Sequence, residues 1–307
     1  MVAYRMPWKH WSPERLGVAL AIVAALGFSF KAIFVKLAYA VPQVVPVDAV
    51  TLLSLRMLFA LPVFAWVAFQ SGRAAPPLSR RDWMTLAALG MLGYYGASIF
   101  DFIGLQYISA GLERLILFTY PTLTVLIGVL FMGRPIHRRE MAALLLTYAG
   151  IALAFFHDLE FVGETNAVLI GGLFVFASSL AYALYLSGSA SMIQRLGTAR
   201  FTALTMIVST LATQIHFFLA QPPSALNQPL PVYAYSAAMA LFSTVLPVFT
   251  LSAAIRRIGP SPTVLIGTLG PVLTIAFGWW LLGEPLSLAQ MAGVGLVLAG
   301  VMLVSRR

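Results

Sequence analysis

The sequence predicts an all-α integral membrane protein with ten transmembrane helices, arranged as two five-helix repeats of inverted topology. Its composition is the first observation behind this prediction. Of the 307 residues, 60% are hydrophobic and 9% are charged, whereas an ordinary soluble domain has about a quarter charged residues. A soluble fold of this length cannot hide so much apolar surface, so the solvent of this chain is a lipid bilayer.

An internal repeat at an offset of 150 residues is the second observation. The clearest matched positions are Gly133 and Gly283, Pro135 and Pro285, and Pro121 and Pro271. An odd number of spans separates the two copies, so they face opposite sides of the membrane. Inverted repeats are a common plan of secondary transporters, in which two related halves move against each other around a central site.

Each predicted span is an apolar run of about 20 residues, the length that a helix needs to cross a bilayer. The runs are continuously apolar rather than alternating, which favours helices over a membrane barrel. The spans are 16–39, 49–71, 83–107, 112–132, 140–157, 166–190, 201–220, 233–254, 261–282 and 287–304. We expect residues 1–15 to form a cytoplasmic segment, residues 16–157 the first repeat and residues 166–304 the second.

The net charge of +9 is interpreted as a topology signal rather than a nucleic-acid footprint. With the N-terminus taken as cytoplasmic, fifteen Lys and Arg residues at the span ends fall on one side of the bilayer. The other side instead carries acidic residues: Asp48, Asp158, Glu160, Glu164 and Glu284. This positive-inside pattern predicts a multi-pass protein of a bacterial inner membrane with both termini in the cytoplasm.

Two matching stretches carry a family resemblance. The first copy contains Gly133-Arg134-Pro135 and later Tyr148-Ala-Gly-Ile, and the second contains Leu282-Gly-Glu-Pro-Leu and later Leu298-Ala-Gly-Val. These copies resemble the repeat of EamA-type proteins of the drug/metabolite transporter superfamily. Arg134 departs from the usual Glu, as the cytoplasmic location of the first copy explains. The resemblance covers nearly the whole chain and implies ten helices, a central cavity, and export of small metabolites, often amino acids.

Charged residues inside spans cost about 2.5–3.5 kcal/mol each on insertion scales and usually face a cavity or a partner. The first repeat has a group of them that the second lacks: Lys31, Lys36, Arg56, Asp101, Glu113 and Arg114. One interpretation is an internal salt-bridge network, for example Arg56 or Lys31 with Asp101. The other is that Lys31 or Arg56 binds a substrate carboxylate, while Asp101 or Glu113 binds an ammonium, relays a proton or gates the path. We expect Lys36 and Arg114 to extend to the outer interface.

Lys31 is the strongest candidate for substrate contact, because it lies too deep in its span to reach the interface easily. Tyr94, Tyr120 and Tyr182 are further candidates for substrate binding. A tyrosine hydroxyl at mid-membrane depth needs a partner, which another helix or a ligand can supply. Packing is the alternative interpretation for each ring.

Pro121 and the pair Gly270-Pro271 are predicted hinges, since they lie at equivalent repeat positions near the middle of the membrane. Proline removes a backbone hydrogen bond and can kink a helix. A matched pair of kinks fits the wall of a cavity between two moving halves.

The sequence therefore predicts a secondary transporter that exports hydrophobic or aromatic amino acids, or similar small metabolites, by alternating access. The alternative is a transporter of phosphorylated or sugar-linked organic anions, with Lys31 and Arg56 as a clamp. The sequence contains no phosphate-binding loop, metal-ligand cluster, catalytic triad or cysteine, so we expect no enzyme activity, metal or cofactor. The expected partners are a small-molecule substrate and the bilayer, but not nucleic acid. Movement follows the gradient of the substrate itself, or that of a proton if Asp101 or Glu113 titrates. The expected state is a monomer or homodimer.

Overall fold

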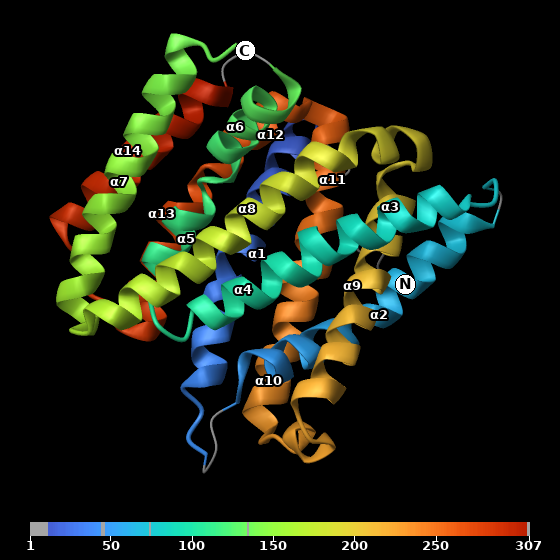
Figure 1. Ribbon diagram of the computed structural model, residues 1–307, viewed down its shortest axis with the longest axis horizontal. Helices are drawn as coiled ribbons and strands as arrows, with labels where there is room; N and C mark the ends of the chain where they lie inside the picture. The colour runs from blue at the N-terminus through green and yellow to red at the C-terminus, as the bar shows by residue number, and fades with distance from the viewer. Residues whose placement is uncertain (1–11, 44–46, 74, 134, 306–307) are drawn as a thin grey trace, which may run out of the picture.

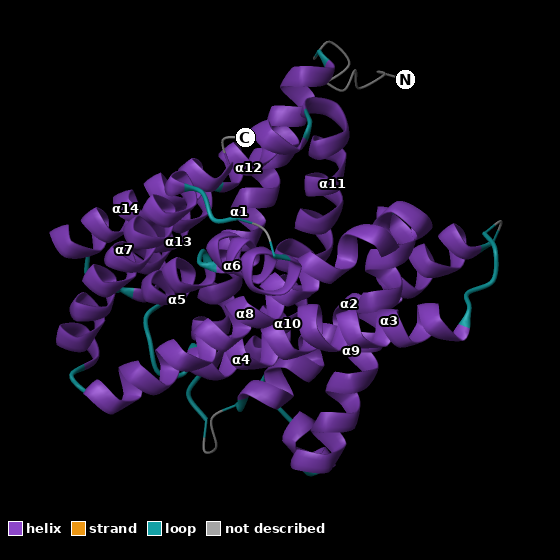
Figure 2. Cartoon of the chain, turned by 45° about the horizontal axis from the view of Figure 1, so that its top comes forward, coloured by secondary structure: helices purple, strands orange, loops and turns teal. Residues whose placement is uncertain are grey.

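The computed structural model describes residues 12–43, 47–73, 75–133 and 135–305. This part of the chain is helical, with short connections and no strand (Figures 1 and 2). In chain order the elements are α1 (Pro13–Tyr39), α2 (Ala49–Gly72), α3 (Arg80–Gly90), η2 (Met91–Gly96), α4 (Ala97–Gly104), α5 (Ala110–Leu117), α6 (Tyr120–Met132), α7 (Arg138–Val162), α8 (Thr165–Leu196), α9 (Thr198–Ala220), η3 (Pro223–Leu226), α10 (Leu230–Ala240), η4 (Leu241–Val245), α11 (Leu246–Ile258), α12 (Pro260–Gly267), α13 (Leu269–Phe277), η5 (Gly278–Leu282) and α14 (Leu288–Ser305).

Nine helical segments within the described residues are long and apolar enough to cross a bilayer, and the shorter apolar helix Leu288–Leu303 follows them. Together they correspond to the ten predicted spans, so the predicted all-α membrane fold is confirmed. The main differences in length are at α7 and α8, which end at Val162 and Leu196 and so run past the predicted ends. Most of the predicted segment 1–15, Arg134 and the two C-terminal arginines lie outside the described residues.

Several helical irregularities recur in both halves at the same offset of 150 residues, although the π-helical η5 has no counterpart in α6. Both η2 and η4 are π-helical turns, and they begin at equivalent positions in the third and eighth spans. The fourth span breaks at Phe118, between α5 and α6, and the ninth span breaks at Thr268, between α12 and α13. Gly133 and Gly283 follow these spans in the left-handed conformation, with φ angles of 63° and 70°. The repeat therefore extends to the interruptions of the helices as well as to their order.

The predicted proline kinks are helix breaks in the structure. Pro121 and Pro271 each lie in the first turn of a new helix, α6 and α13 respectively. A proline is tolerated there because the first N–H groups of a helix have no intrahelical partner. The hinge role of Pro121, Gly270 and Pro271 stays a prediction.

The main helix contacts join one half to the other. The first span of each half packs against the third span of the opposite half, as α1 with α11 and α8 with α4. The second spans pack together as α2 with α9, and the fifth and tenth as α7 with α14. These reciprocal pairs are what a two-fold relation between the repeats requires. The halves are interleaved rather than separate bundles, so side chains of both halves meet in the centre.

The pair α7 and α14 forms one edge of the molecule, where a green and a red helix lie together in Figure 1. Their backbones touch at Gly150 and Gly293. A Cβ built on Gly150 would lie 2.5 Å from the Gly293 carbonyl oxygen, and one built on Gly293 would lie 2.6 Å from the Gly150 oxygen. Small residues allow this close approach between membrane helices. This pair therefore fixes one edge of the junction between the halves.

Candidate functional site

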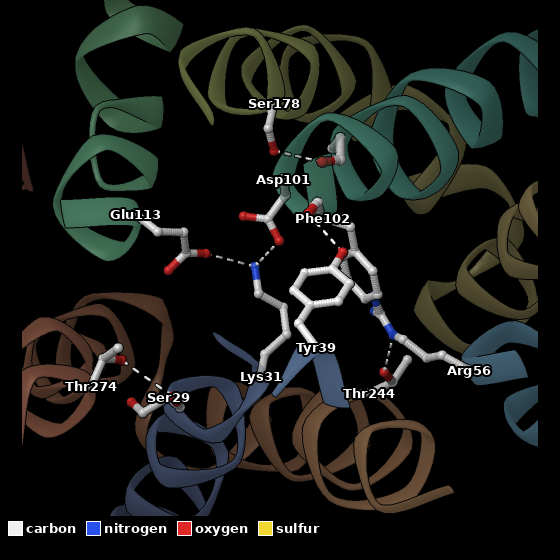
Figure 3. A network of polar contacts seen from close by, with 11 residues as sticks. Ser29, Lys31, Tyr39, Arg56, Asp101, Phe102, Glu113, Ser178, Thr244 and Thr274 are labelled. Carbon is white, nitrogen blue, oxygen red and sulfur yellow. Dashed lines mark hydrogen bonds and ion pairs between the residues drawn. The ribbon is translucent and has the colours of Figure 1, made fainter. Parts of the chain in front are cut away.

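Lys31 of α1 lies between two carboxylates in the interior (Figure 3). Its Nζ atom is 2.7 Å from Oδ2 of Asp101 on α4 and 3.0 Å from Oε1 of Glu113 on α5. The Asp101 and Glu113 side chains are buried, with exposed fractions of 2% and 0%. One ammonium faces two carboxylates, so the cluster carries an excess negative charge when all three are ionised. A low-dielectric interior disfavours such an excess, and a proton or a second cation would remove it.

Contacts with the second half hold α1 beside this cluster. The Ser29 hydroxyl donates a hydrogen bond to the carbonyl oxygen of Gly270 at 3.1 Å. In return, the Thr274 hydroxyl donates to the carbonyl oxygen of Ser29, with a longer separation of 3.4 Å. The ring of Phe30 stacks on Phe277 with centroids 4.2 Å apart. The position of Lys31 therefore depends on α13, although its two acid partners belong to the first half.

Two buried acids anchor the N-terminus of α5, which carries Glu113. Asp158 of α7 accepts hydrogen bonds from the backbone N–H and the hydroxyl of Ser109, at 2.8 and 2.6 Å. Glu284 accepts from the backbone N–H of Ala110 at 2.8 Å. Negatively charged hydrogen-bond acceptors stabilise a helix N-terminus, because the first N–H groups are unpaired and the helix dipole is positive there.

From the sequence, Asp158 and Glu284 were interpreted only as acidic residues on the outer side of the membrane. The structure shows that both side chains are buried. Glu284 lies in the connection between η5 and α14, outside the membrane-spanning segments. Burial raises the pKa of its carboxyl group, while the Ala110 hydrogen bond and the charge of Lys36 oppose the rise. The repeated Gly-x-Pro stretch marked the position of Glu284 in the sequence. It did not show that the carboxylate would accept a hydrogen bond at the N-terminus of α5.

The sequence offered Arg56 or Lys31 as the ion-pair partner of Asp101, and the structure pairs Asp101 with Lys31 and not with Arg56. Its Nε atom donates to Oγ1 of Thr244 in η4 at 3.0 Å, and its Cζ atom lies 5.4 Å from the centre of the Phe102 ring. The side chain is buried and its Nη1 atom has no hydrogen-bond partner in the described part of the protein. In Figure 3 the rings of Tyr39 and Phe102 lie between Arg56 and Lys31. Arg56 therefore flanks the ion cluster without belonging to it.

The sequence predicted that Arg114 extends to the outer interface, but the structure places its guanidinium group in the interior. Its Cζ atom lies 5.2 Å from the centre of the Phe118 ring, and its Nε atom is buried. A Cβ built on Gly270 would lie 2.7 Å from Nη2 of Arg114, so the guanidinium group packs against the start of α13. The sequence could not reveal this contact, because it joins positions on the two halves of the protein.

The three candidate tyrosines lie in one aromatic cluster, joined by Tyr185. The ring of Tyr120 lies 5.2 Å from Tyr182, which lies 5.8 Å from Tyr185, and Tyr94 lies 5.3 Å from Tyr185. Spans three and four each contribute to this cluster and to the ion cluster, since Tyr94 and Asp101 share one span and Tyr120 and Glu113 the other. The sequence hypothesis that these rings line a substrate site stays a prediction.

Residues 15–156 and 169–306 each match the EamA-like transporter family. The chain belongs to the EamA-like transporter family. Relatives include two proteins of Bacillus subtilis that are named uncharacterized transporters. YcbK is 30% identical over 291 residues, which cover 91% of this chain and 89% of the relative. YyaM is 26% identical, with 74% of each chain covered.

A related protein of Archaeoglobus fulgidus, also named an uncharacterized transporter, is 23% identical across 93% of this EamA-like transporter and 98% of the relative. A solved crystal structure has a similar fold, with a TM-score of 0.64 and 18% sequence identity. The similarity covers 94% of this chain and 95% of that structure. The transporter class and the ten-helix fold thus agree with what the sequence predicted.

Proposed function

We propose that this EamA-like transporter is a secondary transporter that exports hydrophobic or aromatic amino acids, or similar small metabolites. The ion cluster of Lys31, Asp101 and Glu113 is the observation that carries the proposal. It is buried and lies on three helices, and the spans that supply its acids also supply aromatic rings. Charged residues inside membrane spans are rare and commonly mark a substrate or ion path.

The excess of carboxylate over ammonium supports a substrate that carries an amino group. Lys31 occupies one oxygen of each acid, and Asp101 Oδ1 and Glu113 Oε2 have no hydrogen-bond partner in the described part of the protein. An ammonium group has three donors and no acceptor, so it would satisfy such oxygens. The tyrosine cluster offers aromatic faces for an apolar or aromatic side chain.

The same excess supports coupling to a proton. Asp101 and Glu113 share one ammonium group, and a proton bound to the pair would offset the second negative charge. An incoming ammonium group would compete with that proton for the same oxygens. Exchange of substrate for a proton follows from this competition, and it needs no nucleotide or other energy source.

The inverted repeat supports alternating access. π-Helical turns and helix breaks lie at equivalent positions in the two halves, and such irregularities are frequent at functional points of helices. The positive-inside pattern supports an inner-membrane protein with both termini in the cytoplasm. With that orientation, Glu284 and its bond to Ala110 lie on the outer side.

Transport of labelled amino acids into proteoliposomes tests the proposal. Wild type and Lys31→Ala are compared side by side, with and without a pH gradient, and Glu160→Gln serves as a control because Glu160 is exposed on α7. We expect uptake of hydrophobic or aromatic amino acids by wild type and the control, and loss of uptake in Lys31→Ala. The substrate class is wrong if wild type moves none of these amino acids.

A phosphorylated or sugar-linked anion is the second candidate, supported by the two guanidinium groups. Neither Arg56 nor Arg114 has an acid within ion-pair distance among the described residues. The clamp of Lys31 and Arg56 is less well supported, because Lys31 already contacts two acids and aromatic rings separate it from Arg56. Competition by organic phosphates, without competition by amino acids, would favour this candidate.

A further inference from the structure

The guanidinium group of Arg114 lies directly against the backbone of the opposite half. Gly270, the second residue of α13, leaves the space that the group fills. A Cβ at this position would be 2.7 Å from Nη2 and 3.4 Å from Nε of Arg114. The group also lies over the ring of Phe118, with its Cζ atom 5.2 Å from the ring centre. A planar cation thus contacts both an aromatic ring and the backbone at Gly270.

This cation has no counter-ion at ion-pair distance among the described residues. No acid lies within 4.0 Å of Arg114 in the described part of the chain, although Glu113 precedes it in sequence. Its Nε atom is buried and makes no hydrogen bond. Gly270 lies at the N-terminal end of α13, where the helix dipole is positive and adds to the charge instead of offsetting it. The free-energy cost of burying an unpaired cation inside the protein falls when an anion binds beside it.

The repeat shows that the space at Gly270 is particular to the second half. The equivalent residue of the first half is Tyr120, whose ring belongs to the tyrosine cluster. The equivalent of Arg114 in the second half is Val264. The shared scaffold therefore requires neither the arginine nor the glycine, and the two occur together across the interface.

We propose that Arg114, resting against Gly270, binds the carboxylate of the substrate while Asp101 and Glu113 bind its ammonium group. This inference rests on the proposed function and names the substrate class as a zwitterion. Glu113 and Arg114 are consecutive on α5, so one short helix presents a group of each sign.

The aromatic contacts indicate where the rest of such a substrate lies. Phe118, beneath the guanidinium group, contacts Tyr120 edge to face at 6.2 Å, and Tyr120 in turn contacts Tyr182. An amino acid with an aromatic side chain would engage all three features. An amine without a carboxylate, or a carboxylate without an amine, would engage only part of them.

Ligand-dependent thermal stability of the purified protein in detergent tests the inference. The ligands are L-phenylalanine, phenethylamine, which lacks the carboxylate, and hydrocinnamate, which lacks the amine. We expect wild type to bind phenylalanine about tenfold more tightly than phenethylamine, as one charge-assisted contact implies. Arg114→Gln should abolish this preference, and Arg114→Lys should retain part of it.

Two glycine variants on the same span provide a matched pair that leaves the charge in place. Gly270→Ala should displace the guanidinium group and reduce the preference for the carboxylate. Gly267→Ala should behave as wild type, because a Cβ there meets nothing within 4 Å. An unchanged preference in Arg114→Gln, or equal effects of the two glycine variants, would overturn the inference.

Transport of the same ligands separates failure of the inference from failure of the proposed function. Wild type that binds phenylalanine with the expected preference but does not transport it would refute the function and keep the carboxylate site. Wild type that transports phenylalanine and phenethylamine equally well would keep the transport function and refute the carboxylate site. Absence of both binding and transport would refute both.

Discussion

The carboxylate of Glu284 accepts a hydrogen bond from the backbone N–H of Ala110 across the boundary between the two halves, at 2.8 Å. Ala110 begins α5, the short helix that carries both Glu113 and Arg114. The Leu-Gly-Glu-Pro stretch of the second repeat therefore anchors the helix that supplies two charges of the proposed site. On the same side, Nε2 of His157 lies 3.2 Å from the carbonyl oxygen of Pro285 and adds a second link.

Removal of this anchor should destabilise the protein. Glu284→Ala is expected to lower the free energy of unfolding by about 1.5–3 kcal/mol, as for a hydrogen bond to a charged group. Glu284→Gln should cost less, because its amide oxygen can still accept the bond. Denaturant unfolding in detergent measures both values, with Glu164→Gln as the exposed control. An Ala variant as stable as the control would contradict the anchor.

The raised pKa of Glu284 predicts a dependence of stability on pH. The folded protein holds the Glu284 proton above the ordinary glutamate pKa of 4.5, so it binds more protons there than the unfolded chain does. Stability from this group is present at low pH and is lost as pH rises through the folded pKa. Glu284→Gln should make the stability curve flatter over that range. A curve that keeps the same slope in the variant would show that Glu284 does not cause it.

The composition of the ion cluster predicts that substitutions of its members destabilise the protein by unequal amounts. Lys31→Gln leaves two buried carboxylates without a cation and should destabilise the protein by about 3–5 kcal/mol at neutral pH. Glu113→Gln leaves Lys31 and Asp101 as a one-to-one pair and should cost much less. Unfolding of the two variants under the same conditions gives the comparison, and the reverse order would disprove this description of the cluster.

The contact between α7 and α14 predicts a selective effect of added methyl groups. Gly150→Ala should lower the melting temperature, since its Cβ would lie 2.5 Å from a backbone oxygen of the other helix. Gly295→Ala on α14 should be neutral or slightly stabilising, because its Cβ meets nothing within 4 Å and alanine favours a helix. Equal melting temperatures for the two variants would mean that the helices do not approach each other so closely.

Hydropathy and charge were enough to predict the fold from the sequence. Each span has to satisfy its backbone hydrogen bonds within itself, so an apolar run of sufficient length specifies a helix without knowledge of its neighbours. The break positions were harder to place. Pro121 and Pro271 indicated interruptions, but a proline fits the first turn of a helix as well as a kink, and local sequence does not decide between them.

The candidate site was predicted only in part, because its contacts join distant segments. Lys31, Asp101 and Glu113 were found as charges that a membrane disfavours, and the structure brings all three together. The packing of Arg114 depends on the absence of a side chain at Gly270, which no local pattern reveals. The contacts of Asp158 and Glu284 could not be predicted for the same reason. Both acids accept hydrogen bonds at the N-terminus of α5, which is distant from them in the sequence.

Exchange of labelled L-phenylalanine by Asp101→Asn in proteoliposomes tests the central claim most directly. Wild type and Glu160→Gln, which alters an exposed carboxylate on α7, are measured beside it. We predict that wild type and the control exchange phenylalanine and that Asp101→Asn, folded and reconstituted to the same level, exchanges it at least about tenfold more slowly. Exchange by Asp101→Asn at the rate of the control would contradict the claim that the buried ion cluster is the transport site.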